Sequence, residues 1–423
     1  MKNIFTIQDS LENKISYYHL AAFVIMLPFD RFYSELILIS LILHTLIHIN
    51  KQKLFSILSW QNLLLCSVFL INITGLIWSH DKEQATKDIL RQLAIFLFPL
   101  IYSVTGMDIL KYKKKLLILF ACSITITILY LYADAFHILG YNKLPIKVLF
   151  SPAFINHNFS EPVGIHATYL SMYVSLSIAS FLYYFLQEKN NSNRILYAAS
   201  IVILLAGLVQ LASRSVLIAT IIFIILGFPF FKIKGIKKSR FIIITLTTSL
   251  IIFFGITKTD SLKKRYTIEL KDDLTQASIN NEILEPRIIR WHYALRLIKQ
   301  SPVIGYGSGS EKRLLKETYF ENKLYNSYLN ELNAHNQYLS ILLKTGVVGL
   351  IIFMLTIFCG FAIAWLKQDI VWAAFMVIIS IVSFSENILD VNKGIFFYAF
   401  FFSFFMIPGK PFERLFRLGR RKA

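Results

Sequence analysis

A histidine marks the point where a long polar stretch of the chain meets an apolar one. His335 lies in the segment Asn-Ala-His-Asn-Gln-Tyr, and the apolar run that follows contains Gly346 and Gly349. Histidine titrates near neutral pH, so a histidine at this position could take a proton from a hydroxyl nucleophile. The alternative is a structural histidine, since the chain has 9, and His157 and His166 are rival candidates for the same role.

Arg214 is the second candidate for chemistry. It is the only charged residue between the start of the apolar run 195–212 and the end of the next run, 215–231. A guanidinium binds phosphate oxygens bidentately and keeps its charge, and an ionisable group so close to a membrane span is a functional candidate. The alternative is an interfacial arginine whose side chain snorkels to water.

Arg287 and Arg290 are three residues apart, so they would share one face of a helix. Pro286 just before them favours a helix start, and the free N–H groups of a helix N-terminus attract anions. Two arginines at such a position could clamp a diphosphate. The alternative is a solvated basic face, because Arg296 and Lys299 follow.

These residues belong to a chain that has too little polar surface for a water-soluble globule. Hydrophobic residues make up 56% of the chain and charged residues 16%, with a mean hydropathy of +0.57, whereas soluble chains have about 25% charged residues. A net charge of +19 would suit a nucleic-acid-binding protein, but in so apolar a chain it is typical of membrane-protein loops. We therefore expect an all-α integral membrane protein that contacts membrane lipids and no nucleic acid.

The apolar runs are numerous enough for about 12 transmembrane helices, each of which needs about 20 mostly apolar residues. The tenth run is long, and we expect it to be broken near Gly346 and Gly349. The predicted spans are 15–30, 33–49, 57–79, 89–106, 116–139, 163–186, 195–212, 215–231, 241–257, 337–366, 370–385 and 394–408.

Loop charge orients these spans. With both termini in the cytoplasm, the cytoplasmic segments carry 22 Lys and Arg against 6 Asp and Glu, and most of the alternate loops are nearly neutral. Basic residues accumulate on the cytoplasmic side of membrane proteins, so the even number of spans and the charge pattern agree.

One outer loop is much longer than the others. Residues 258–334 are polar, and a helical repeat of Ile288, Trp291, Leu295 and Ile298 lies within them before a glycine-rich segment at 305–309. Long loops are usually functional, and we interpret this one as a helical subdomain over the membrane core. The predicted organisation is spans one to nine in 1–257, the loop subdomain in 258–334, spans ten to twelve in 335–408 and a basic cytoplasmic tail in 409–423.

Several familiar catalytic motifs are absent from the sequence. It has no Walker loop, no GxSxG, no HExxH and no DxD-like pair for a metal with a nucleotide sugar, and Asp272-Asp273 is interpreted as a solvated acidic pair. The three cysteines lie in apolar runs without metal-ligand or disulfide spacing. We therefore expect no cofactor, no metal and no use of ATP.

The histidine motif resembles the hallmark of a known family. His335-Asn336, nine residues and then Gly346-Val-Val-Gly349-Leu350 are similar to the motif of the O-antigen ligases, whose superfamily also contains O-antigen polymerases and bacterial protein O-glycosyltransferases. The resemblance covers about 163–405. Further similar features are Ser213-Arg214, Pro302-x-x-Gly305-x-Gly307 after an Arg-rich helix, and a late acidic residue, Glu386 or Asp390.

The resemblance implies an inverting glycosyltransferase at the periplasmic face of the bacterial inner membrane, independent of metal and ATP. The implied donor is a glycan on undecaprenyl diphosphate, and the implied acceptor is a sugar hydroxyl of lipid A–core in lipopolysaccharide biosynthesis. Under this hypothesis His335 is the catalytic base, while Arg214 and one or both of Arg287 and Arg290 bind the diphosphate.

Two other functions are also compatible with the sequence. An O-antigen polymerase or a protein O-oligosaccharyltransferase would use the same chemistry with another acceptor, and Arg296, ten residues, then Gly307 is similar to an arginine–glycine pattern of polymerases. A lipid-linked glycan flippase could also have about 12 spans. It would place charges deep within several spans, where the sequence has few beyond Arg91 and Lys344.

Overall fold

The computed structural model describes residues 5–231, 236–268, 278–279, 282–283 and 286–407. Within these ranges the expected helical fold is confirmed, apart from one short antiparallel ladder of β1 (Ser278–Ile279) and β2 (Glu282–Ile283). The acidic pair at 272–273 and the basic tail at 409–423 lie outside the described residues.

Each predicted span coincides with a helix or with consecutive helices. In the first half these are α1 (Leu11–Met26), α2 (Arg31–Ile47), α3 (Trp60–Gly75), α4 (Lys82–Val104), α5 (Ile109–Tyr141), α7 (Ala167–Gln187) and α8 (Asn191–Gln210). Then come α9 (Arg214–Ile222), η5 (Phe223–Gly227) and α10 (Phe228–Phe231) as one run, and α11 (Ile236–Lys258), α17 (Gln337–Leu366), α18 (Ile370–Val382) and α19 (Asn392–Met406).

Shorter elements connect these helices. They are η1 (Lys51–Leu58), η2 (Ile146–Phe150), η3 (Pro152–Phe154), α6 (His157–Ser160), η4 (Glu161–Val163), α12 (Asp260–Lys263), η6 (Lys264–Ile268), α14 (Arg287–Gln300), α15 (Ser310–Glu321) and α16 (Tyr325–Leu329). Polar caps explain many of the helix starts, because a side-chain oxygen there accepts a free backbone N–H. Such caps are Ser10, Asp30, Ser59, Asp81, Asp108, Asn190, Asn336 and Asp369.

The long apolar helices identify a membrane protein. In the part of the chain that the structure describes, 4 helices (α5, α7, α8 and α17) are long and apolar enough to cross a membrane, and η1 with α3, bent by 51°, would make 5. The α9–η5 run and α18 are apolar but shorter. The arrangement of about 12 spans therefore remains a prediction.

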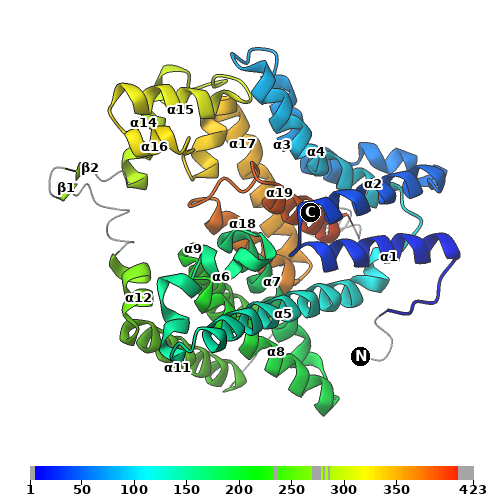
Figure 1. The fold of residues 1–423 in the computed structure, drawn as a ribbon. Helices are drawn as coiled ribbons and strands as arrows, with labels where there is room; N and C mark the ends of the chain where they lie inside the picture. The colour runs from blue at the N-terminus through cyan, green and yellow to red at the C-terminus, as the bar shows by residue number, and fades with distance from the viewer. Residues whose placement is uncertain (1–4, 232–235, 269–277, 280–281, 284–285, 408–423) are drawn as a thin grey trace.

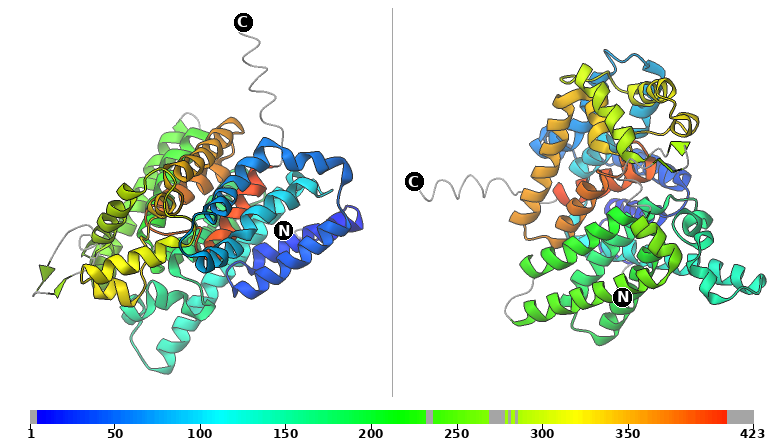
Figure 2. Two further views of the ribbon diagram at one scale, coloured as in Figure 1. Left: turned by 90° about the horizontal axis from the view of Figure 1, so that it is seen from above. Right: turned by 90° about the vertical axis from the view of Figure 1, so that its left-hand side faces the viewer.

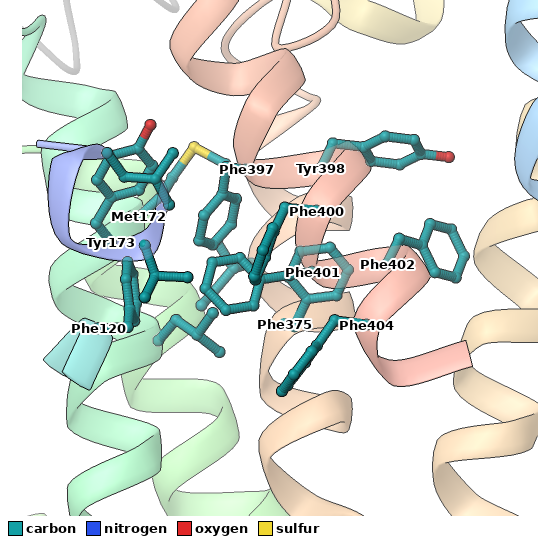
Figure 3. Close-up of a cluster of buried hydrophobic side chains, with 14 of the residues drawn as sticks. Phe120, Met172, Tyr173, Phe375, Phe397, Tyr398, Phe400, Phe401, Phe402 and Phe404 are labelled. Atoms are coloured by element: carbon teal, nitrogen blue, oxygen red, sulfur yellow. The ribbon is translucent and has the colours of Figure 1, made fainter. Parts of the chain in front are cut away.

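An aromatic core surrounds α19. This helix is apolar on every side and buried along nearly its whole length, as expected for a helix without a polar face. In Figure 3 its Phe401 packs toward Phe120 of α5, and its Phe397 and Phe401 pack toward Phe375 of α18. This packing fixes α18 and α19, and with them the loop that joins the two helices.

The predicted break in α17 is confirmed at Gly346, where φ is 64° and ψ is −163°. The carbonyl oxygens of Leu343 and Lys344, just before the break, accept the backbone N–H groups of Tyr306 at 2.8 Å and Gly307 at 2.9 Å. The glycine-rich segment is therefore seated in the break of α17, and it ties the polar loop to the helix that follows His335.

The helices α14, α15 and α16 gather beside the first half of α17 (Figure 1). They share a small apolar core with α17, made of Ala294, Ile298, Leu315, Tyr319, Leu324, Ala334, Leu339 and Leu343. The predicted helix in the long loop is confirmed, but its predicted apolar face is wrong at Leu295, which is exposed. Ala294 takes its place in the core. The buried face of the helix is therefore shifted by about one residue from the predicted one.

Candidate active site

A cavity of about 350 Å³ lies where α6, α7, α9, η6 and α14 meet the turn before α17 and the loop between α18 and α19. Three of the four predicted site residues line it: Arg214, Arg287 and His335. Its other polar walls come from His157, His166, Thr168, Ser213, Ser215, Arg265, Ser385 and Glu386, and its apolar walls from Ile218, Trp291, Ile381 and Phe384.

His335 stands in a tight turn that aims its ring at the cavity. Its φ is 45°, a region that residues other than glycine enter mainly at special turns. The side chain of Asn333 accepts the backbone N–H of His335 at 2.9 Å, and the indole of Trp291 donates to the carbonyl of Ala334 at 2.9 Å. The turn is therefore held by its own asparagine and by α14.

A carboxylate supports the His335 ring. Nδ1 of His335 lies 3.3 Å from Oε2 of Glu386, and Nη2 of Arg287 lies 3.7 Å from Oε1 of the same carboxylate. Burial opposes ionisation of Glu386, but His335, Arg287 and His166 outweigh it and lower the pKa of Glu386. An ionised Glu386 accepts a hydrogen bond from the N–H at Nδ1 of His335, which leaves the lone pair on Nε2.

Three arginines give the cavity positive charge. Arg214 begins α9 after a turn of three residues, and its Nη1 donates to the carbonyl of Arg265 at 3.4 Å. Arg265, from η6, also lines the cavity. Arg287 donates to the carbonyl of Ser385 at 2.9 Å, so the α18–α19 loop sets its direction. Guanidinium groups brought together in this way suit a diphosphate.

Arg290 lies apart from these arginines although it shares α14 with Arg287. It is buried, and its Nη1 donates to the carbonyl of Asn333 at 3.5 Å. The spacing of three residues places both arginines on neighbouring parts of the helix, yet Arg287 faces the cavity and Arg290 faces the turn before His335.

His157 and His166 line the cavity side by side. Their ring centroids are 3.9 Å apart. Burial lowers the pKa of His166 to about 4, and burial together with the charge of Arg265 lowers the pKa of His157. Both rings are therefore neutral at pH 7, and they can accept or donate hydrogen bonds without adding charge.

A buried carboxylate behind the cavity joins the two loops that carry His335 and Glu386. Oε1 of Glu311, on α15, accepts the backbone N–H of Ala334 at 3.1 Å and the side-chain amide of Asn387 at 3.1 Å. Oε2 of Glu311 lies 3.3 Å from Nζ of Lys344. The residue before His335 and the residue after Glu386 are thus held by one side chain.

Asp390, the other late acidic residue, has a different place. Both of its carboxylate oxygens pair with Nζ of Lys344, at 2.8 and 2.7 Å, and it accepts the amide of Asn387 at 3.0 Å. Of the two acidic residues that the sequence proposed, Glu386 therefore contacts the histidine and Asp390 belongs to the buried network behind it.

Sequence reasoning missed two functional candidates. Arg265 follows two lysines at 263–264, so it reads as part of a solvated basic run. Glu311 is one of many charges in the polar loop, and only the fold shows that this residue is 3% exposed. No local signal distinguishes either residue.

Fold and site together define a helical membrane protein with a cationic cavity and a histidine–carboxylate pair. Residues 199–354, more than a third of the chain, match the family model described as O-antigen ligase. This match confirms, over residues 199–354, the resemblance that the histidine motif indicated. The segment is similar to the O-antigen ligase and polymerase superfamily of glycosyltransferases. The segment contains Arg214, Arg265, Arg287 and His335 and ends before Glu386.

A curated relative gives a second, shorter match. An uncharacterized protein of Haemophilus influenzae (strain ATCC 51907 / DSM 11121 / KW20 / Rd) is 32% identical over 98 residues, which is 23% of this chain. The chain spans only 25% of that relative's length. This similarity adds no statement about activity.

Proposed function

We propose that this protein is an O-antigen ligase that moves a glycan from undecaprenyl diphosphate to a sugar hydroxyl of lipid A–core. The observation that carries the proposal is the contact between His335 and Glu386 in a cavity that also holds Arg214, Arg265 and Arg287. A base and a diphosphate site must lie side by side for such a transfer, and the cavity brings together residues whose chemistry suits both roles.

In the proposed reaction the acceptor hydroxyl attacks the anomeric carbon of the donor sugar. Nε2 of His335 takes the hydroxyl proton, while Glu386 stabilises the positive charge that develops on the imidazole. The new bond joins the acceptor oxygen to the anomeric carbon. The bond to the diphosphate breaks, and its electron pair leaves with undecaprenyl diphosphate. Attack opposite the leaving group inverts the anomeric carbon.

The three arginines would stabilise the leaving diphosphate as its charge grows. Fixed guanidinium groups act most strongly where charge develops in the transition state. We assign Arg287, rather than Arg290, to the diphosphate because Arg287 lines the cavity while Arg290 donates to the carbonyl of Asn333. The diphosphate carries its own activation and the arginines supply the positive charge, so the proposed reaction uses neither ATP nor a metal.

We also propose that the cavity faces the periplasm, with both termini in the cytoplasm and about 12 spans in the inner membrane. Support comes from the distribution of basic residues and from the coincidence of every predicted span with a helical segment. Both lipid substrates would then reach the cavity from the membrane.

Complementation tests this proposal. In a strain without its own ligase, the wild-type protein should restore polymer-bearing lipopolysaccharide on a gel, and His335→Ala should leave bare core. His292→Ala, at an exposed histidine of α14, is the matched control and should act like wild type. Normal ligation by a well-expressed His335→Ala protein would reject the proposed base.

The same gel separates ligase from polymerase. A polymerase would join the donor glycan to a second lipid-linked glycan with the same base and arginines. In a strain without its own polymerase, only a polymerase would convert single-repeat caps into long chains. Restoration of chain length there, with no effect in the ligase-deficient strain, would assign the protein to the polymerase branch.

A further inference from the structure

A lateral arm projects from the helix body beside the cavity. It consists of residues 135–160, which form the end of α5, then η2, η3 and α6. Figure 2 shows this segment extending sideways from the other helices in both views. Four side chains make a small core inside it: Ala135, Leu139, Leu149 and Phe154. The arm is therefore a folded segment with its own apolar core, not an extended loop.

The outer surface of the arm is apolar and basic. Tyr141 is 82% exposed and Ile146 is 70% exposed, and Phe136, Leu144 and Phe150 are exposed as well. The arm has no Asp or Glu, whereas Lys143 and Lys147 are both exposed. Neither lysine pairs with an acidic residue in the described part of the chain. Such a surface is unfavourable in water but fits a lipid with an anionic headgroup.

The length of α5 places the arm at a membrane surface. This helix has 33 residues, so it is about 50 Å long, whereas the hydrocarbon core of a bilayer is about 30 Å thick. The cytoplasmic end of α5 is fixed in our proposal by the basic run 111–115. Its other end then emerges on the periplasmic side, where lysines are disfavoured without a specific reason.

The arm is tied to the wall of the cavity. The side-chain amide of Gln210, the last residue of α8, donates to the carbonyl of Leu149 at 2.7 Å and also to that of Phe154. The carbonyl of Gln210 accepts the backbone N–H of Asn156 at 3.0 Å. The next residue, His157, lines the cavity. A lipid held on the arm would therefore lie on a segment that is joined directly to the wall of the cavity.

We propose that the lateral arm docks the lipid acceptor, an acylated glycolipid with phosphate groups. Lys143 and Lys147 would bind its phosphates, and Tyr141 and Ile146 would contact its acyl chains. The donor does not need this surface, because its diphosphate has the arginines of the cavity. The inference rests on the proposed function, since it assigns the arm to the acceptor of that reaction.

Native mass spectrometry of the purified full-length protein in detergent tests the docking. The probe is diphosphoryl lipid A, with phosphatidylglycerol at the same concentration as the competing anionic lipid. Lys143→Glu with Lys147→Glu should weaken retention of lipid A by about tenfold or more, because each lysine faces an anionic headgroup. Lys299→Glu with Lys323→Glu, at exposed positions of the α14–α16 region, makes the same charge change and should leave retention unchanged.

Two results would overturn the assignment. One is equal retention of lipid A by the arm variant and the control variant. The other is complete competition by phosphatidylglycerol, since the arm would then be a general membrane anchor. If the double Glu variant fails to fold, Lys143→Gln with Lys147→Gln replaces it, and a loss of about threefold is expected for this milder change.

The docking and the proposed reaction can fail separately. His335→Ala should keep full retention of lipid A even though it cannot transfer the glycan. If an arm variant retains lipid A as wild type does, the docking is rejected and the proposed reaction is not affected. Full transfer by His335→Ala rejects the reaction, while the binding result is read independently of it.

Discussion

Nδ1 of His335 and Oε2 of Glu386 lie 3.3 Å apart, although 51 residues separate the two in the chain. The turn before α17 and the loop between α18 and α19 bring them together on one wall of a cavity. A histidine with an ionised carboxylate on one nitrogen presents a basic lone pair on the other. This contact supports our proposal that His335 is the base of the reaction.

Glu386→Gln should reduce turnover by about tenfold or more, because an amide cannot stabilise the imidazolium as a carboxylate does. Affinity for the donor should change little. The check is the initial rate of glycan transfer against donor concentration, with Glu317→Gln on the exposed face of α15 as control. Unchanged turnover in the Glu386 variant would leave His335 without its supporting carboxylate.

Arg214→Lys, Arg265→Lys and Arg287→Lys should each weaken donor binding by about tenfold, since a lysine replaces a bidentate fork by a point charge. Titration with undecaprenyl diphosphate measures this directly. Arg313→Lys, at an exposed arginine that pairs with Glu317 at 2.9 Å, should bind the donor normally. Wild-type affinity in all three cavity variants would contradict the diphosphate site.

Glu311→Ala should destabilise the fold by about 3 kcal/mol, because it removes one partner of a buried ionic network. Glu311 accepts the N–H of Ala334 and the amide of Asn387, next to His335 and Glu386. We therefore expect both the melting temperature and the turnover to fall. Thermal unfolding in detergent gives the first quantity and the transfer assay the second. The exposed Glu321→Ala should change neither. A fully stable Glu311→Ala protein would show that this carboxylate does not hold the two loops together.

Gly346→Ala should destabilise the protein by about 1–3 kcal/mol, because its φ of 64° strains any residue with a Cβ. An added Cβ would also lie 2.2 Å from the carbonyl oxygen of Val303. Gly255→Ala is the control, since a Cβ there meets nothing within 4 Å. Equal melting temperatures for the two variants would show that the break in α17 tolerates a side chain.

Acidification should destabilise the protein partly through His166. Burial lowers the pKa of His166 from 6.5 to about 4, so between these values the unfolded chain binds more protons than the folded protein. Stability therefore falls as pH drops through this window. His166→Gln should lose less in melting temperature between neutral and acid pH than wild type does. The exposed His292→Gln should show the same change of melting temperature with pH as wild type. If His166→Gln shows that same change, His166 is not a source of the acid sensitivity.

The sequence predicted the helices well because their signal is local. An apolar run bounded by polar caps needs no distant partner to form a helix, and the break at Gly346 follows from a glycine that accepts positive φ. The rotation of α14 was missed at Leu295, because which side of a short helix is buried depends on the core that α15 and α17 supply.

The site was predictable only in part. His335 and Arg214 stand beside apolar runs, and Arg287 follows a proline that favours a helix start, so the types of these residues are informative at their positions. The choice between Arg287 and Arg290, and between Glu386 and Asp390, depended on tertiary contacts that spacing does not encode. Nor did any pattern mark Arg265, whose position depends on how η6 packs beside α9.

Transfer of a labelled glycan from a synthetic undecaprenyl diphosphate donor to lipid A–core by purified protein tests the central claim most directly. We expect His335→Ala to lower the transfer rate by about 100-fold or more while it binds undecaprenyl diphosphate as tightly as wild type does. A His335→Ala protein that transfers the glycan at the wild-type rate would contradict the account.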